Sequence, residues 1–238
     1  MLTLRKSEER GHADRGWLNS YHTFSFADYH DPKHMAFRSL RVINDDVVAP
    51  GRGFGAHAHR DMEILSYVLS GKLAHKDSMG HTEILGPNEI QKMSAGSGVV
   101  HSEFNGSDDE PVHFMQVWIE PDPKARGSAP SYEQLQFDAA EKQNRFKLLA
   151  TPVGSPAPGA ARIQQDARVS VAELDTGKRL TYALGIDRHA WLHVVHGEVS
   201  VNGRTLVAGD AIAAEQEPAL EIAAQGPSKS EILLFDLA

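Results

Sequence analysis

Two short runs of the sequence, HAHRDME and HSEFN, combine imidazole and carboxylate side chains two residues apart. The first contains His57 and His59, and the second contains His101 and Glu103. Residues i and i+2 of a β-strand point to the same face, so each pair can present two ligands from one strand. Two such strands facing each other would supply nitrogen and oxygen donors to one divalent metal. That donor set suits a first-row transition metal better than calcium or magnesium.

Each pair lies within a longer motif that contains glycine. The first, G-x5-H-x-H-x3-E, runs over residues 51–63, and the second, G-x2-H-x3-N, runs over residues 98–105. The chain between them is long enough for two strands and their turns. Together the motifs resemble the two signature motifs of the cupin superfamily, which folds as a small antiparallel β-barrel or jelly roll.

The resemblance extends to a particular family within that superfamily. Residues 16–32, 40–46, 53–64 and 93–105 look like the pirin family, and are most similar to bacterial members that act as quercetin 2,3-dioxygenases. The resemblance is dense over residues 1–135 and covers the rest by layout only. It implies an all-β bicupin fold, with two antiparallel barrels or jelly rolls, few short helices and one active site.

The resemblance also implies the metal ligands, which are His57, His59, His101 and Glu103. It favours Fe(II), although nickel, copper, manganese or zinc would also fit such donors. Glu63 is a competing carboxylate, because it occupies the motif position that many other cupins use. We expect Glu103 to be the ligand and also the catalytic base, and Glu63 to have a structural role.

The expected activity is cleavage of a quercetin-like flavonol by O2 with release of carbon monoxide. Two alternatives remain open from the sequence. One is an oxygenase for a different small enolic substrate. The other is a non-enzymatic, metal-binding regulator that contacts protein partners, as described for related pirins.

Composition excludes several other classes of function. The 238-residue chain carries a net charge of −8, which disfavours direct binding to nucleic acid. No apolar run approaches the ~20 residues of a membrane helix, and the charged N-terminus lacks the apolar core of a signal peptide. We therefore expect a cytoplasmic protein. Because the chain has no cysteine, thiolate ligands are excluded.

Short apolar runs bounded by glycine and proline predict strands throughout the chain. The segment SYEQLQFDAAEKQNRF is the best helix candidate, with Ser131 as its cap. We expect a metal-binding domain over residues 1–135, a helix and a Pro/Gly/Ala-rich linker over 136–161, and a second cupin-like domain over 162–238.

The second domain keeps the hairpin layout of a cupin but lacks the ligands. The positions that match His57 and His59 there are Ala183 and Gly185. We therefore expect no metal role for its three histidines, which are His189, His193 and His196.

Other conspicuous side chains receive structural interpretations. Phe54 is expected to line the pocket. The N-terminal aromatic residues are expected to pack the outer sheet, with the alternative that some of them line the mouth of an aromatic pocket; these are Trp17, Tyr21, Phe24, Phe26 and Tyr29. His75 and His81 are expected on a hairpin away from the ligand pairs, with no role.

Overall fold

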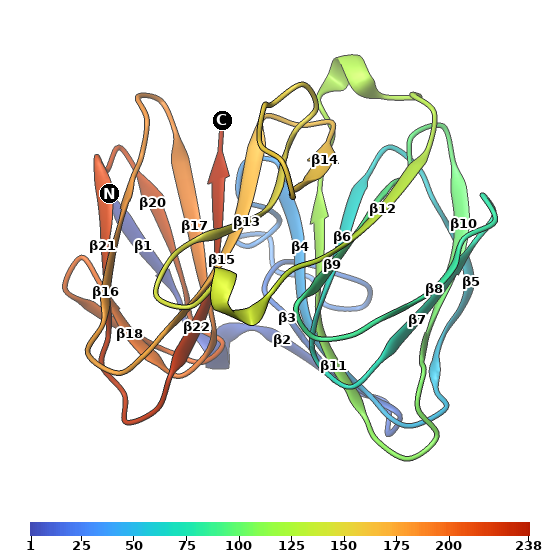
Figure 1. The fold of residues 1–238 in the computed structure, drawn as a ribbon, viewed down its shortest axis with the longest axis horizontal. Helices are drawn as coiled ribbons and strands as arrows, with labels where there is room; N and C mark the ends of the chain where they lie inside the picture. The colour runs from blue at the N-terminus through green and yellow to red at the C-terminus, as the bar shows by residue number, and fades with distance from the viewer. The chain divides into compact units, whose positions relative to one another are not determined.

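The computed structural model describes all 238 residues, and the chain forms two compact units. The N-terminal unit comprises Gly11–Phe137 and Ala161–Gln165. The C-terminal unit comprises Met1–Arg10, Asp138–Ala160 and Asp166–Ala238. Both consist of antiparallel strands, with only three 3-10 turns and no α-helix along the chain (Figure 1). The prediction of an all-β bicupin is confirmed.

The N-terminal unit contains two sheets. The larger has the order β12-β9-β6-β11-β4-β3-β2, and the smaller has the order β5-β10-β7-β8. Their bounds are β2 Gly11–Asp14, β3 Leu18–His22, β4 Leu40–Val48, β5 Gly53–His59, β6 Glu63–Ser70, β7 Leu73–Asp77, β8 Thr82–Leu85, β9 Glu89–Ser94, β10 Val99–Asn105, β11 Val112–Ile119 and β12 Ser131–Gln136, with β14 Ala161–Ile163 and the 3-10 turn η2 Pro123–Ala125.

The burial of side chains alternates along β10, which explains why this strand can carry functional residues. Val99, His101, Glu103 and Asn105 are buried, whereas the residues between them are half-buried or exposed. One face of the strand therefore turns into the unit. The apolar part of that interior is a cluster around the side chains of Leu18, Val48, Val68, Leu73, Leu85, Val112 and Phe114. Burial of such side chains stabilises the barrel by roughly 1.5–3 kcal/mol each.

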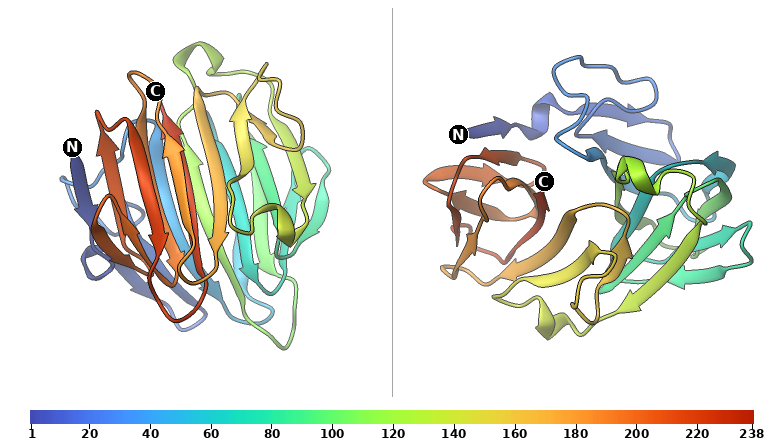
Figure 2. Two further views of the ribbon diagram at one scale, coloured as in Figure 1. Left: turned by 60° about the vertical axis from the view of Figure 1, so that its left-hand side comes forward. Right: turned by 90° about the horizontal axis from the view of Figure 1, so that it is seen from above.

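The C-terminal unit also contains two sheets, with the orders β1-β20-β17-β22-β15-β13 and β16-β21-β18-β19. The first strand of the chain, β1, pairs with β20, and the blue and red strands lie side by side in Figure 2. The bounds are β1 Leu2–Arg5, η1 Ser7–Glu9, η3 Ala139–Glu141, β13 Lys147–Pro152, β15 Ala167–Leu174, β16 Arg179–Ala183, β17 His189–His196, β18 Glu198–Val201, β19 Arg204–Val207, β20 Ala211–Glu215, β21 Ala219–Ala224 and β22 Ser230–Leu237.

The expected domain layout differs from the observed units at their boundaries. Residues 1–10 belong to the C-terminal unit, because β1 completes its sheet. Residues 138–160 of the expected helix and linker also belong to that unit, whereas residues 161–165 belong to the N-terminal unit. The helix expected from Ser131 onward is wrong: Ser131–Gln136 forms β12, which pairs with β9, and only the turn η3 follows. Pairing with a neighbouring strand satisfies the backbone groups that an isolated helical turn would satisfy locally. No helix of the protein has the length and apolarity that a membrane span requires.

Candidate metal centre

The two histidine-containing motifs lie on neighbouring strands of the smaller sheet. In the antiparallel pair of β5 and β10, His101 lies opposite His57, and Val99 lies opposite His59. The register then shifts, so that Glu103 faces Phe54. The extra residue is on β5, next to Gly55. Bulges of this kind re-aim side chains beside functional sites.

The bulge supplies a hydrogen bond that orients His57. Nδ1 of His57 lies 2.8 Å from the carbonyl oxygen of Gly55. A carbonyl accepts only, so Nδ1–H of His57 donates, and the neutral ring keeps a lone pair on Nε2. This arrangement is typical of metal-binding histidines, whose second nitrogen donates to a carbonyl or carboxylate.

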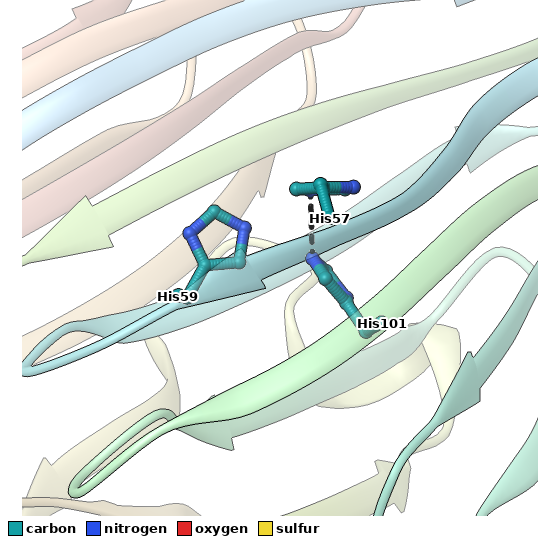
Figure 3. Close-up of side chains that lie close together, drawn as sticks. All are labelled: His57, His59 and His101. Atoms are coloured by element: carbon teal, nitrogen blue, oxygen red, sulfur yellow. Dashed lines mark hydrogen bonds between the residues drawn. The ribbon is translucent and has the colours of Figure 1, made fainter.

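Three imidazoles converge on one point (Figure 3). Nε2 of His57 lies 3.1 Å from Nε2 of His101, and one nitrogen from each of His57, His59 and His101 lies within 4.8 Å of the others. Nε2 of His59 is buried and has no hydrogen-bond partner. Buried polar atoms rarely stay unpaired, so this nitrogen suits an additional ligand. The donors present therefore fit a divalent transition metal.

The surroundings keep two of these histidines neutral. Burial, reinforced by the neighbouring imidazoles, lowers the pKa of His59 to about 4 and that of His101 to about 3. Metal binding requires the neutral imidazole, because only that form has a free lone pair. At neutral pH these two histidines are therefore ready to bind a metal without first losing a proton.

Glu103 is buried next to this cluster and is held by the opposite sheet. Its Oε1 accepts a hydrogen bond from Oγ of Ser66 at 3.1 Å, and its Oε2 accepts one from Nε2 of Gln116 at 2.7 Å. Glu103 groups by distance with His101 and His75, whereas His57, His59 and His101 form a separate group. His101 is the residue that belongs to both groups.

Glu63, the competing carboxylate, lies outside both groups. It begins β6, and its Oε2 accepts a hydrogen bond from Oγ of Ser94 at 2.7 Å. Burial raises its pKa, although the Ser94 hydrogen bond opposes the shift. The side chain therefore connects neighbouring strands of the larger sheet, in agreement with the structural role expected for it.

A cavity of about 460 Å³ opens beside the histidines and lies wholly within the N-terminal unit. Phe54 lines it, as predicted. Trp17 and Phe26 also line it, so for these two residues the alternative of a pocket role holds and the favoured packing role is wrong. Trp17 contacts Phe54 edge to face, and Phe26 contacts Trp118 in the same way, which gives the cavity aromatic walls on two sides. This volume lies within the ~300–1,000 Å³ range of small-molecule sites.

The floor of the cavity is formed by part of a row of polar side chains that the sequence did not reveal. Ser66, Gln116, Asn44 and His22 lie opposite one another on four adjacent strands, β6, β11, β4 and β3. The last three of these side chains line the cavity. Nδ1 of His22 lies 2.9 Å from Oδ1 of Asn44. Because buried polar groups lower stability unless they are satisfied, a row of them in a barrel interior indicates a binding role. No local motif marks this row, since it exists only across strands.

A second polar pair lies next to this row. Oγ of Ser20 donates a hydrogen bond to the carboxylate of Asp46, and both residues line the cavity. Burial raises the pKa of Asp46 to about 7, although the Ser20 hydrogen bond opposes the shift. The cavity therefore contains a carboxyl group that is partly protonated near neutral pH and can donate as well as accept.

His75 is also a residue that the sequence analysis misplaced. Strand β7 pairs with β10, so His75 lies opposite Glu103, and the His75 and His101 ring centroids are 5.4 Å apart. The expectation that His75 and His81 lie away from the ligand pairs is therefore wrong for His75. The pattern His-x-Asp over residues 75–77, on a strand next to the second motif, was the available signal.

The histidines of the C-terminal unit have other partners. Nδ1 of His189 lies 3.7 Å from Oε1 of Glu215, and Nε2 of His196 lies 3.3 Å from Oε2 of Glu231. Glu173 and Glu231 approach His196 closely enough to hold a metal, but Lys229 lies 2.7 Å from Glu173 and Lys142 lies 2.9 Å from Glu231. These cations already neutralise the carboxylates, so the cluster is an ion-pair network.

Comparison with known proteins shows which families and relatives the chain resembles. Residues 3–119 match the family described as Pirin, and residues 148–237 match the family described as Quercetinase C-terminal cupin domain. A quercetin 2,3-dioxygenase of Escherichia coli (strain K12) is 45% identical over 100% of this chain and 99% of its own length. A pirin-like protein of Caulobacter vibrioides is 40% identical over 100% of both.

Comparison with solved structures agrees with these sequence matches. The bacterial pirin YhhW from Escherichia coli, in complex with nickel(II), superposes with a TM-score of 0.92 at 44% identity and covers 100% of this chain and 99% of that one. Fold and site together define a bicupin with a candidate metal centre in its N-terminal unit. The identity over the whole length shows more than the class: the chain belongs to the pirin family. The predicted resemblance to quercetin 2,3-dioxygenases is confirmed.

Proposed function

We propose that the protein is a metal-dependent dioxygenase that cleaves quercetin-like flavonols with O2 and releases carbon monoxide. One observation carries the proposal: three imidazoles converge beside a cavity with aromatic walls and a polar floor. The names of the relatives and the nickel complex of a relative support it.

His57, His59, His101 and Glu103 are the proposed ligands of one divalent metal. Fe(II) is our first choice, and nickel is supported by the relative's complex. A bound metal would supply Lewis acidity, which lowers the pKa of a chelating hydroxyl group. Three imidazoles and one carboxylate leave two positions of an octahedral ion for other ligands, as catalysis requires.

The substrate would bind through its flat rings and its hydroxyl groups. Trp17, Phe54 and Trp118 offer aromatic faces and edges, which stack favourably on aromatic rings. Asn44 and His22 lie on the polar floor, where they can form hydrogen bonds with hydroxyl groups. A flavonol combines both features with a neighbouring hydroxyl and keto group at its chelating end.

Glu103 would accept the proton of the substrate hydroxyl. It lies on the same strand as His101, lines the cavity, and is fixed by Ser66 and Gln116. Positioned general bases of this kind contribute about 10²–10⁴-fold to rate. If Glu103 is also a ligand, it would have to loosen its hold on the metal to take the proton.

An aerobic assay with quercetin tests the proposal. The full-length protein, supplied in turn with iron, nickel, copper and manganese, should bleach the visible absorbance of quercetin and release carbon monoxide. His57→Ala should be inactive, whereas His193→Ala, a matched change at a buried histidine of the other unit, should be active. Absence of turnover with every metal, in protein shown to contain metal, would refute quercetin cleavage and leave the regulator and the oxygenase for a different small enolic substrate.

A further inference from the structure

His101 has a second ring nitrogen that needs a partner. Its Nε2 faces Nε2 of His57 at 3.1 Å, so Nε2 is the atom directed at the metal position. A neutral imidazole that binds a metal through Nε2 carries its proton on Nδ1. Nδ1 of His101 is buried and has no hydrogen-bond partner. The corresponding N–H of His57 has the Gly55 carbonyl, but His101 has no carbonyl in that position.

His75 presents a matching acceptor. Nε2 of His75 lies 3.2 Å from Oδ2 of Asp77, a carboxylate that accepts hydrogen bonds but cannot donate them when ionised. Nε2 of His75 is therefore the donor, and the lone pair of the neutral ring is on Nδ1. That Nδ1 is buried and also has no partner.

Asp77 is itself firmly held. Its Oδ1 accepts the backbone N–H groups of Met79 at 2.8 Å and His81 at 3.1 Å, and its Oδ2 lies 2.9 Å from Nδ1 of His81. Tyr132 stacks on the rings of both His75 and His81, with centroid distances of 5.1 and 4.4 Å. The position and the tautomer of His75 are thus set before any metal binds.

The two unpaired nitrogens complement each other. The His75 and His101 ring centroids are 5.4 Å apart, a separation at which one hydrogen bond can join two imidazole rings edge to edge. A hydrogen bond from Nδ1–H of His101 to Nδ1 of His75 would pair both buried atoms.

We propose that His75 is a positioning residue, whose Nδ1 accepts the Nδ1–H of His101 and so keeps Nε2 of His101 directed at the metal. The chain Asp77, His75, His101 then orients one ligand from within the smaller sheet. This proposal rests on the metal centre of the proposed function. It assigns a role to a buried histidine that touches neither substrate nor metal.

Metal affinity tests the role without any assay of activity. Nickel(II) is titrated into full-length wild-type protein and two variants. His75→Leu keeps the volume but removes the acceptor, and should weaken nickel binding about 10–100-fold, as loss of such orienting partners does. His75→Asn places an amide oxygen near the position of Nδ1 and should restore most of the affinity. His193→Leu, at a buried histidine of the other unit, should bind nickel as the wild type does.

A spectroscopic readout separates orientation from mere packing. In 15N-labelled, zinc-loaded wild-type protein, the long-range 1H–15N spectrum should show His101 protonated at Nδ1 and His75 protonated at Nε2. Wild-type affinity in His75→Leu, or equal losses in the Leu and Asn variants, would overturn the proposal. A wild-type protein that binds no nickel would instead refute the metal centre itself.

Discussion

Nε2 of His57 and Nε2 of His101 lie 3.1 Å apart, on two different strands. Two imidazole nitrogens at this distance either share one proton or face a common cation. Their rings are tilted by 54°, so both lone pairs can point to one position between them (Figure 3). The pair therefore defines where a metal ion would sit, and the first prediction follows from it.

Purified protein should carry close to one equivalent of a divalent transition metal. His57→Ala or His101→Ala should abolish binding, because each removes one of few donors. Elemental analysis of both variants checks this result. The matched control is alanine substitution of His189, His193 or His196, which should leave the metal content unchanged. A second equivalent lost from any control would show a further site in the C-terminal unit.

Glu103→Gln should lower quercetin turnover about 10²–10⁴-fold, because the amide keeps the shape but loses the basicity. Metal affinity should fall less than for a lost histidine, since three imidazoles remain. Glu63→Gln should have a much smaller effect, because Glu63 bonds to Ser94 outside the cluster. Turnover and bound metal are measured for both variants in parallel. An inactive Glu63→Gln beside a near-wild-type Glu103→Gln would reverse the two roles.

The metal-free protein should lose stability as the pH falls below about 6.5. Burial lowers the pKa of His59 to about 4 and that of His101 to about 3, whereas the ordinary value is 6.5. Between these values the unfolded chain binds protons at both histidines that the folded protein does not, so these groups make acid favour unfolding. The raised pKa of Asp46, about 7, acts in the opposite direction, and the two histidines outweigh it. Thermal unfolding at a series of pH values from neutral to about pH 4 measures how steeply stability depends on pH. His59→Gln should make this dependence less steep. An unchanged dependence would contradict the lowered pKa of His59.

Asn44→Leu should weaken discrimination between hydroxylated substrates. Asn44 belongs to the polar floor, and adjacent strands are about 4.8 Å apart, so its amide lies one strand beyond Gln116. A lost hydrogen bond of about 1 kcal/mol corresponds to roughly a fivefold loss in kcat/KM. The kcat/KM for quercetin is compared with that for an analogue that lacks the two hydroxyl groups on the phenyl substituent of quercetin. The variant should lose rate with quercetin only; equal losses with both compounds would exclude recognition by Asn44.

Asp210→Ala should lower the free energy of unfolding by about 1–3 kcal/mol, because two partly buried backbone donors lose their acceptor. Its carboxylate accepts the backbone N–H of Ser7 at 2.8 Å and that of Val207 at 3.2 Å, and it pairs with Lys6 at 2.8 Å. Lys6→Ala should have a smaller effect, because the ammonium group is partly exposed. Urea unfolding of both variants gives the comparison, and equal losses would assign the stability to the ion pair alone.

The sequence predicts the parts of the site that depend on local periodicity. His57 and His59 share a strand face because they are two residues apart, and the same holds for His101 and Glu103. Those relationships need no knowledge of distant residues. The all-β class follows for the same reason, since turns and alternation are local signals.

The missed features all depend on which strands become neighbours. His75 reaches His101 because β7 pairs with β10, and the polar floor exists only after four strands align in register. The segment from Ser131 satisfied the local criteria for a helix, but β9 offered a strand partner. Cross-strand pairing outweighed local capping, as tertiary context often does for weak propensities.

The pairing of β1 with β20 has a consequence for how the chain folds. Leu2 lies opposite Ala214, so β1 leaves the ribosome long before its partner strand β20 is made. Contacts of such long sequence separation form slowly. Until then, β1 has a free edge that can pair wrongly. A cut anywhere in the middle of the chain would also separate this strand from its sheet, so the C-terminal half cannot be produced intact as one continuous fragment.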